Sequence, residues 1–267
     1  MRRSKFTLLA ILLFGCTEPM VPGSVEAPQR HPTFSLSAAA NEAVLPSGYA
    51  SLMGETNNSF PHSQKNLRYQ QVFQGSDVVD PTIVGLCLRR DDLFGGSSIT
   101  QTLTIKLGPT SLDYTNLGVS FDANYSAPAT EVFSGDVVIP ASAGGGTPAD
   151  FDLCIPFTQS YVHLSGSNVI VEVVNSSLTS SGRARDACAD GVAQCTTARA
   201  FAFSATAEDA VLVQQGGLVM KFISPEPPPP VEPVTKDDCK QGGWADFGFR
   251  NQGQCIRFVE TGMDSRS

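Results

Sequence analysis

Residues 99–107 read ITQTLTIKL, and this stretch decides the fold class. Successive side chains of a β-strand point to opposite faces of its sheet. One face here carries the apolar side chains, which are Ile99, Leu103, Ile105 and Leu107. The other face carries three threonines and Lys106. The alternation predicts a strand with one face in a hydrophobic core and the other face in water.

Further strands of similar composition are expected along the chain. They are rich in β-branched and aromatic residues and lie at 67–75, 81–90, 131–139, 151–157, 168–174, 199–206 and 217–223. Turn-forming clusters separate several of them, as at 95–97, 143–147 and 165–168. No long helical pattern links the strands, and only 16% of residues are charged. We therefore expect an all-β fold over residues 45–224, an antiparallel, jelly-roll-like sandwich of two layers.

The N-terminus has the plan of a secretory signal. Arg2, Arg3 and Lys5 precede an apolar run over residues 6–14, which is too short to span a bilayer. Residues 13–16 (LFGC) resemble the lipobox of bacterial lipoproteins, in which the cysteine is acylated and becomes the first residue. The resemblance implies a signal peptide at 1–15, lipidation of Cys16 by acyl chains such as palmitate, and a flexible tether at 16–44. The alternative is an ordinary signal peptide with a chance cysteine.

Charge restricts the partners. Residues 1–15 carry three cations and no anions, so their removal shifts the formal charge from −8 to −11. Nucleic acid and anionic headgroups would repel such a chain. We expect no nucleic-acid partner, and contact with the membrane through the lipid anchor alone. The expected location is extracytoplasmic, at an outer membrane or cell surface.

Six cysteines remain once Cys16 is assigned to lipid, an even number in a compartment where disulfides persist. Their spacing favours three pairs, which are Cys87–Cys154, Cys188–Cys195 and Cys239–Cys255. Strand alternation puts Cys87 and Cys154 each on the more polar face of its strand, opposite Val84, Leu86 and Leu88 in the first case. Two separately buried thiols are the alternative for that pair.

A proline-rich stretch marks the second boundary. Residues 225–235 are expected to form a stiff linker, followed by a module at 236–267 that is too small for an ordinary core and needs a disulfide. The only tryptophan of the chain lies inside the loop closed by Cys239 and Cys255. Two interpretations stay open for the module. Trp244, Phe247 and Phe249 form its core, or they offer an aromatic platform to a glycan or cell-wall ligand.

Two further resemblances concern the sandwich region and the C-terminal segment. Residues 66–77 (NLRYQQVFQGSD), 83–90 (IVGLCLRR) and 151–174 resemble, in order and spacing, a group of secreted bacterial β-sandwich proteins. Residues 235–262 (TKDDCKQGGWADFGFRNQGQCIRFVETG) are similar to a short C-terminal segment that recurs behind diverse secreted bacterial proteins. Neither resemblance implies catalytic residues, and the biochemical role of the second group is undefined.

Residues for chemistry are sparse. The three histidines have neither metal-site nor triad spacing, and the pairs Asp77/Asp80, Asp91/Asp92, Asp150/Asp152 and Glu208/Asp209 fit strand ends and turns as well as catalysis. Loop oxygens at 122–124 and 186–191 leave calcium open without assigning it. We expect no catalytic residues, no metal site and no cofactor. The predicted function is non-catalytic binding or a structural role at the cell surface, with glycan or cell-wall recognition as the candidate. The alternative is an extracellular hydrolase acting on polysaccharide.

Overall fold

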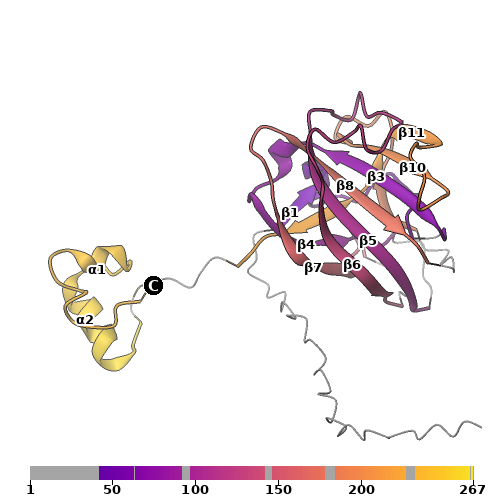
Figure 1. The fold of residues 1–267 in the computed structure, drawn as a ribbon. Helices are drawn as coiled ribbons and strands as arrows, with labels where there is room; N and C mark the ends of the chain where they lie inside the picture. Colours follow the sequence, from indigo (N-terminus) through magenta and orange to yellow (C-terminus); the bar gives the residue numbers. More distant parts are fainter. Residues whose placement is uncertain are drawn as a thin grey trace, which may run out of the picture. The chain divides into compact units, whose positions relative to one another are not determined.

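The computed structural model describes residues 42–62, 64–91, 97–141, 146–177, 184–226, 232–264 and 266. The expected signal peptide, the lipidated Cys16 and the tether up to residue 41 lie outside these ranges. The described chain comprises a β-sandwich and a small helical module at the C-terminus, and each is described by itself (Figure 1). No helix of the described residues is long and apolar enough to cross a membrane.

The described residues form thirteen strands in the sandwich and its attachments. They are β1 (Glu42–Leu45), β2 (Thr56–Asn58), β3 (Leu67–Phe73), β4 (Thr82–Leu88), β5 (Ile99–Thr110), β6 (Thr130–Ile139), β7 (Leu153–Val162), β8 (Asn168–Asn175), β9 (Arg185–Cys188), β10 (Ala198–Ala202), β11 (Leu212–Gln215), β12 (Gly217–Leu218) and β13 (Met220–Ile223). Two single turns of 3-10 helix, η1 (Ser47–Tyr49) and η2 (Gly75–Asp77), follow β1 and β3.

The strands form two main antiparallel sheets, as predicted. One has the order β1-β13-β4-β7, and the other the order β11-β10-β3-β8-β5-β6. A third, small sheet has the order β12-β9-β2. Without the β10–β11 hairpin, which extends the second sheet beyond β3, two sheets of four strands remain. Their strand order is that of a jelly roll, because the strands of each Greek key alternate between the two sheets.

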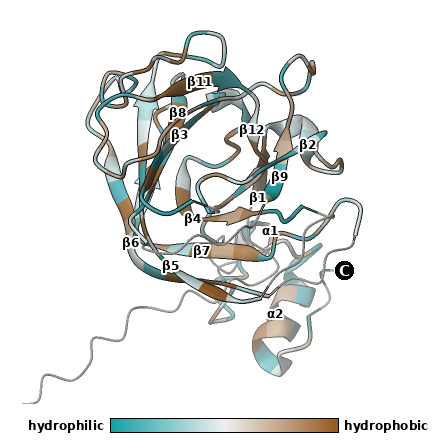
Figure 2. Cartoon of the chain, turned by 90° about the vertical axis from the view of Figure 1, so that its right-hand side faces the viewer, coloured by the Kyte–Doolittle hydropathy of each residue, from teal (hydrophilic) through white to brown (hydrophobic). Residues whose placement is uncertain are grey.

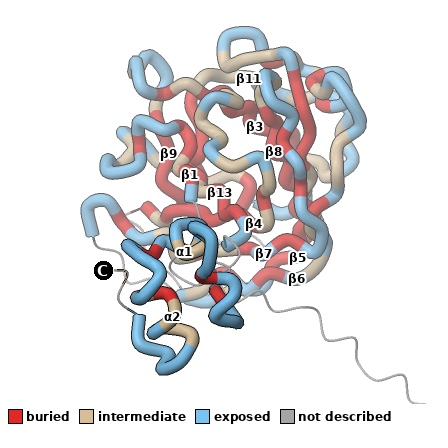
Figure 3. Tube along the Cα trace, turned by 90° about the vertical axis from the view of Figure 1, so that its left-hand side faces the viewer, coloured by how far each residue is buried: buried red, intermediate tan, exposed pale blue. Residues whose placement is uncertain are grey.

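The main core lies between the two large sheets. Leu103, Ile105 and Leu107 of β5 are buried there, while Thr100 and Thr102 on the opposite face are exposed, which confirms the predicted alternation. Leu86 and Leu88 of β4 belong to the same core cluster. Figure 2 shows hydrophobic segments on strands of both sheets, and Figure 3 shows these strands largely buried while the connecting loops are exposed.

One predicted face is wrong in β4. Val84 was expected to share the core face with Leu86 and Leu88, but the register with β7 shifts between Ile83 and Gly85. At this point a single residue of β4, Val84, stands against four residues of β7, 157–160, so the pairing is interrupted and the regular side-chain alternation does not continue through it. Ile83 therefore enters the core cluster, and Val84 is only half-buried.

The sandwich also begins earlier than residue 45. The strand β1 takes up residues 42–44 of the expected tether and pairs with β13, where Glu42 faces Ile223. The strands β2, β9 and β11 were not expected either, and each has three or four residues. Strands this short are fixed by partners far away in the chain, so they carry little periodicity of their own.

The outer face of the six-stranded sheet is covered in part by the connection between β5 and β6. Leu117 and Phe121 of this connection pack on Val72, Ile170 and the small residues of β10. The connection is tied to the sheet by its backbone, since the Ser126 N–H donates to the Pro109 carbonyl over 2.9 Å. Because the connection covers only part of the sheet, the outer face is not flat.

The C-terminal module is built around the Cys239–Cys255 disulfide. Two helices, α1 (Gly243–Asp246) and α2 (Gln252–Thr261), pack with Phe249 against the buried cystine. The side chain of Asn251 accepts a hydrogen bond from the Gln254 N–H at the start of α2. Gly262 ends α2 in the left-handed conformation that favours glycine. The helices were not predicted from the sequence.

Candidate functional site

All three predicted disulfides are present. Cys87 and Cys154 lie directly opposite each other in the register of β4 and β7, with their Cα atoms 4.0 Å apart. The alternative of two separate thiols is therefore wrong. The pair Cys188–Cys195 closes a short loop after β9, and Cys239–Cys255 closes the loop that holds Trp244.

The predicted aromatic platform is only partly accessible. Phe249 is buried against the cystine and belongs to the core of the module, so it cannot offer a face to a ligand. Trp244 and Phe247 are half-buried and pack against the same cluster. Arg266 covers the rings of Phe249 and Phe258, with its guanidinium carbon 4.8 and 5.0 Å from their centroids. The arrangement favours the core interpretation for Phe249 and leaves part of Trp244 open.

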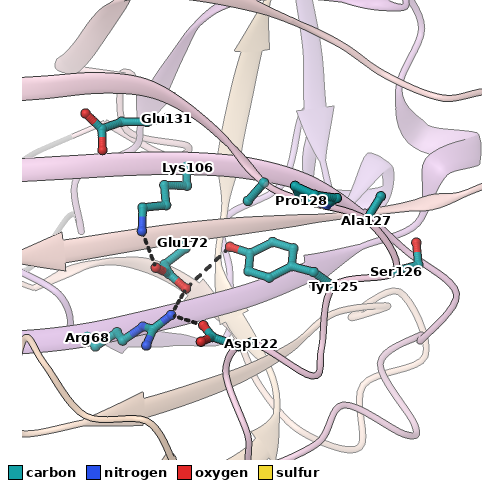
Figure 4. Close-up of a pocket in the computed structure, with 10 residues that line it drawn as sticks. Arg68, Lys106, Asp122, Tyr125, Ser126, Ala127, Pro128, Glu131 and Glu172 are labelled. Atoms are coloured by element: carbon teal, nitrogen blue, oxygen red, sulfur yellow. Dashed lines mark hydrogen bonds and ion pairs between the residues drawn. The ribbon is translucent and has the colours of Figure 1, made fainter.

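A polar pocket lies on the outer face of the six-stranded sheet, beside the connection between β5 and β6 (Figure 4). Its volume is about 530 Å³. Ten residues line it, which are Arg68, Lys106, Asp122, Tyr125, Ser126, Ala127, Pro128, Ala129, Glu131 and Glu172. Five of them carry charged side chains, so the lining of this pocket is strongly polar.

The pocket floor is a row of polar residues that crosses four adjacent strands. Gln70 of β3 faces Glu172 of β8, Glu172 faces Lys106 of β5, and Lys106 faces Glu131 of β6. Directly opposed residues point to the same face of a sheet and stand about 5 Å apart. The antiparallel register therefore gathers two acids, a cation and an amide on one line.

Glu172 is the centre of this row and has no exposed surface. Its Oε2 accepts hydrogen bonds from Gln70 Nε2 at 2.6 Å and Arg68 Nη2 at 2.9 Å. Tyr125 Oη lies 3.4 Å from the same oxygen. Lys106 Nζ is 3.7 Å from Oε1, which has no hydrogen-bond partner. Figure 4 shows the side chains of Arg68, Lys106 and Tyr125 converging on Glu172 from different elements.

Arg68 is held rigidly beside this carboxylate. It bridges Glu172 and Asp122, at 2.9 and 2.8 Å, and it donates a further bond of 2.9 Å to the Ala207 carbonyl. Its guanidinium carbon also stands 4.6 Å from the centroid of the Phe121 ring. A guanidinium with this many partners positions its neighbours more than it moves toward a ligand.

Tyr125 reaches the pocket because β5 has a glycine below it. A Cβ atom on Gly108 would come within 2.6 Å of the Tyr125 ring, so any other residue would displace the ring. Burial, together with the negative charge of Glu172, raises the pKa of Tyr125 far above its usual range. The phenol is therefore a neutral hydrogen-bond donor at any physiological pH.

The lining side chains differ in access. Glu172 is inaccessible and the Arg68 side chain is 12% exposed, whereas the Lys106 side chain is 36% and that of Asp122 82% exposed. Glu131 is exposed and stands apart from the cluster in Figure 4. A ligand in the pocket would therefore meet Lys106, Asp122 and Glu131, with the buried Glu172 and Arg68 behind them.

The described acids of the pairs weighed in the sequence do not line this pocket, and Asp92 lies outside the described residues. Asp77 and Asp80 accept backbone hydrogen bonds from Ser47 and Thr82, and Asp152 pairs with Arg185. The calcium candidates are engaged as well. Asp122 pairs with Arg68, the Asn124 amide binds Gln70 and Gly118, and the buried Asp186 pairs with Arg89. Among the residues that the structure describes, no three His, Cys, Asp or Glu side chains are grouped to hold a metal ion.

Sequence reasoning missed Glu172, Lys106 and Arg68 as a site, although one signal was available. Glu172 is the only charged residue in the apolar stretch NVIVEVVN of β8. A charge in the middle of a central strand must find partners, because burying it alone is costly. The partners themselves come from β3, β5 and a loop, and the sequence gives no indication of those pairings.

No family model, curated protein or solved structure matches this chain. The interpretation of the pocket therefore depends on its own geometry and chemistry.

Proposed function

We propose that this chain is an extracytoplasmic binding protein, anchored by lipid at Cys16, whose outer-face pocket binds a neutral saccharide without catalysing a reaction. The observation that carries the proposal is the polar row through Gln70, Glu172, Lys106 and Glu131, with a pocket above it. The three disulfides are typical of an oxidising extracytoplasmic compartment, where saccharides are abundant ligands.

The charges of the pocket favour a neutral ligand. Two cations and three carboxylates line it, and the carboxylates of Asp122 and Glu131 are the most exposed of these groups. An anionic ligand would meet these two carboxylates first and be repelled. Arg68, the cation best suited to bind an anion, already has two acidic partners.

The hydroxyl groups of a sugar match the hydrogen-bond donors and acceptors that are accessible in the pocket. A sugar hydroxyl both donates and accepts hydrogen bonds, and the pocket offers donors at Lys106 and Ser126 next to acceptors at Asp122 and Glu131. The ammonium of Lys106 is beyond hydrogen-bond distance from Glu172, so it keeps donors for a ligand. Ala127, Pro128 and Ala129 form an apolar rim, which suits the C–H face of a sugar ring.

The environment of Glu172 argues against a glycosidase. Glycosidases of the common kind use two carboxyl groups that both reach the scissile bond, one of them as proton donor. Glu172 is inaccessible, and its Oε2 is occupied by Gln70 and Arg68. Lys106 separates it from Glu131 in the row. The buried acid is thus placed to hold cations, and the exposed acids to accept hydrogen bonds.

The alternative of a polysaccharide hydrolase has one observation in its favour, the three carboxylates around a single pocket. It predicts that reducing ends accumulate when the protein is incubated with polysaccharides, and that Glu131→Gln abolishes their release. The binding proposal expects no release from any substrate.

Binding is tested by calorimetric titration of residues 16–267, carrying Cys16→Ala, with a panel of neutral and acidic oligosaccharides. We expect a neutral oligosaccharide of the panel to bind. Lys106→Met should lower the affinity for it about tenfold, because a charged hydrogen-bond donor is lost. Lys65→Met is the matched control, since Lys65 is exposed and lies outside the pocket. Equal affinity of the two variants would contradict the proposed site.

A further inference from the structure

A second pocket, chemically unlike the first, lies at one end of the sandwich. It is formed by Gly75, Ser76, Val78, Val79 and Pro81, which follow β3, and by His163 and residues 165–168, which join β7 to β8, and its volume is about 600 Å³. The two walls are tied to each other. The His163 N–H donates to the Pro81 carbonyl over 2.7 Å, and the Gly75 N–H donates to Asn168 Oδ1 over 2.9 Å.

Close packing fixes the base of this pocket. A Cβ atom on Gly75 would lie 1.8 Å from the Ser167 carbonyl oxygen and 3.0 Å from His163 Nε2. Only glycine fits between these groups, so the turn after β3 is held directly against the imidazole. The pocket is therefore formed in advance of any ligand.

Among the described residues that line this pocket, His163 is the one with an ionisable side chain. The residue is only 8% exposed, and its Nδ1 is buried without a hydrogen-bond partner. Burial lowers the pKa of His163, so the ring is neutral at physiological pH. A neutral imidazole has one donor and one acceptor nitrogen. A buried polar group without a partner is uncommon in folded proteins and calls for an explanation.

The other described residues of the lining carry no charge. Val78, Val79 and Pro81 supply apolar surface, and Ser76 and Ser165 supply hydroxyl groups at the opening. A charged ligand would lose hydration here without gaining a counter-charge from the lining, since Asp77 and Asp80 on the same segment do not line the pocket and accept hydrogen bonds from the Ser47 and Thr82 N–H groups. The ligand must therefore be neutral, with a small apolar part and both a donor and an acceptor.

We infer that this second pocket binds the acetamido group of an N-acetylated amino sugar. The acetamido methyl packs on Val78, Val79 and Pro81, and the amide N–H and carbonyl pair with the imidazole and the serine hydroxyls. The site and its ligand are independent of the outer-face pocket, where the lining is charged and the expected partner is a hydroxyl-rich sugar surface.

The test follows the His163 ring by NMR in the chain of residues 16–267, carrying Cys16→Ala and isotope-labelled histidine. Its signal is identified by its loss in His163→Gln. N-acetylglucosamine is the probe, and glucosamine and glucose are the matched controls. We expect N-acetylglucosamine to shift the His163 signal in a saturable way while the His62 signal stays in place. Binding at the outer-face pocket would leave the His163 signal unchanged, so the two proposals fail separately.

Two variants with the same substitution complete the experiment. Val79→Asp places a carboxylate on the pocket wall. We expect it to lower the affinity for N-acetylglucosamine at least about tenfold. Val138→Asp, at another exposed valine on β6 (63% exposed, against 75% for Val79), should leave the titration unchanged. No shift with N-acetylglucosamine, an equal shift with glucose, or an unchanged affinity in Val79→Asp would overturn the inference.

Discussion

Lys106 of β5 and Glu172 of β8 face each other across the outer surface of the sheet, with Nζ 3.7 Å from Oε1 of a carboxylate that has no exposed surface. Glu172 is bound more closely by Gln70 and Arg68. The two side chains of this pair therefore have different roles. The carboxylate is a fixed anchor, and the ammonium is a partly exposed donor that the anchor holds over the pocket.

Removal of the anchor should destabilise the sandwich. Glu172→Ala removes the buried acidic partner of Arg68 and one of the two acceptors of the Gln70 amide, and a broken buried ion pair costs about 3 to 5 kcal/mol. Urea unfolding monitored by circular dichroism gives the change in the free energy of unfolding. Glu131→Ala, on the exposed side of Lys106, is the control and should change that free energy by less than about 0.5 kcal/mol. Similar values for the two variants would show that Glu172 is no anchor.

Stability should fall in acid because of His62. Burial, helped by the positive charge of Arg185 and opposed by the bond to Gln101, lowers the pKa of His62 to about 3. The unfolded chain binds this proton near pH 6.5. The contribution of neutral His62 is thus complete above pH 6.5 and is lost as the pH falls toward 3. His62→Gln should flatten that part of the curve of unfolding free energy against pH, and an unchanged slope would count against the assignment.

The C-terminal module should depend on its disulfide. The Cys239–Cys255 bond closes a loop with a sequence separation of 16, which is worth about 3 kcal/mol to so small a unit. Trp244 is the only tryptophan of the chain, so its fluorescence reports on the module alone. Replacing both cysteines by alanine should shift its emission to the red while the circular dichroism of the strands persists. Emission that stays at the wild-type wavelength would mean that the module folds without the bond.

Lipid attachment should require Cys16. Cells that express the full chain are labelled with a palmitate analogue, and the label is followed on the protein by gel electrophoresis. We expect label on the wild type and none on Cys16→Ala. The variant Cys188→Ala, which loses a cysteine from the disulfide after β9, should keep its label. Label on Cys16→Ala at the wild-type level would exclude the lipoprotein assignment.

The sequence predicted the elements whose periodicity is local. Alternation in ITQTLTIKL placed Leu103, Ile105 and Leu107 in the core, and cysteine spacing gave the disulfides. It missed the bulge after Ile83, because a bulge depends on the partner strand. It also missed the pocket. Glu172 and Lys106 are 66 positions apart in the chain, and only the register of β5 with β8 brings them together.

The central claim is that the outer-face pocket binds a neutral saccharide, and hydrogen–deuterium exchange tests it most directly. The chain of residues 16–267, carrying Cys16→Ala, is compared with and without a neutral oligosaccharide selected by titration. We predict slower exchange in the connection at residues 122–131 and in β5 around Lys106, and no such change in Lys106→Met. No binding by any neutral saccharide, or slower exchange confined to residues 236–267, would contradict the account.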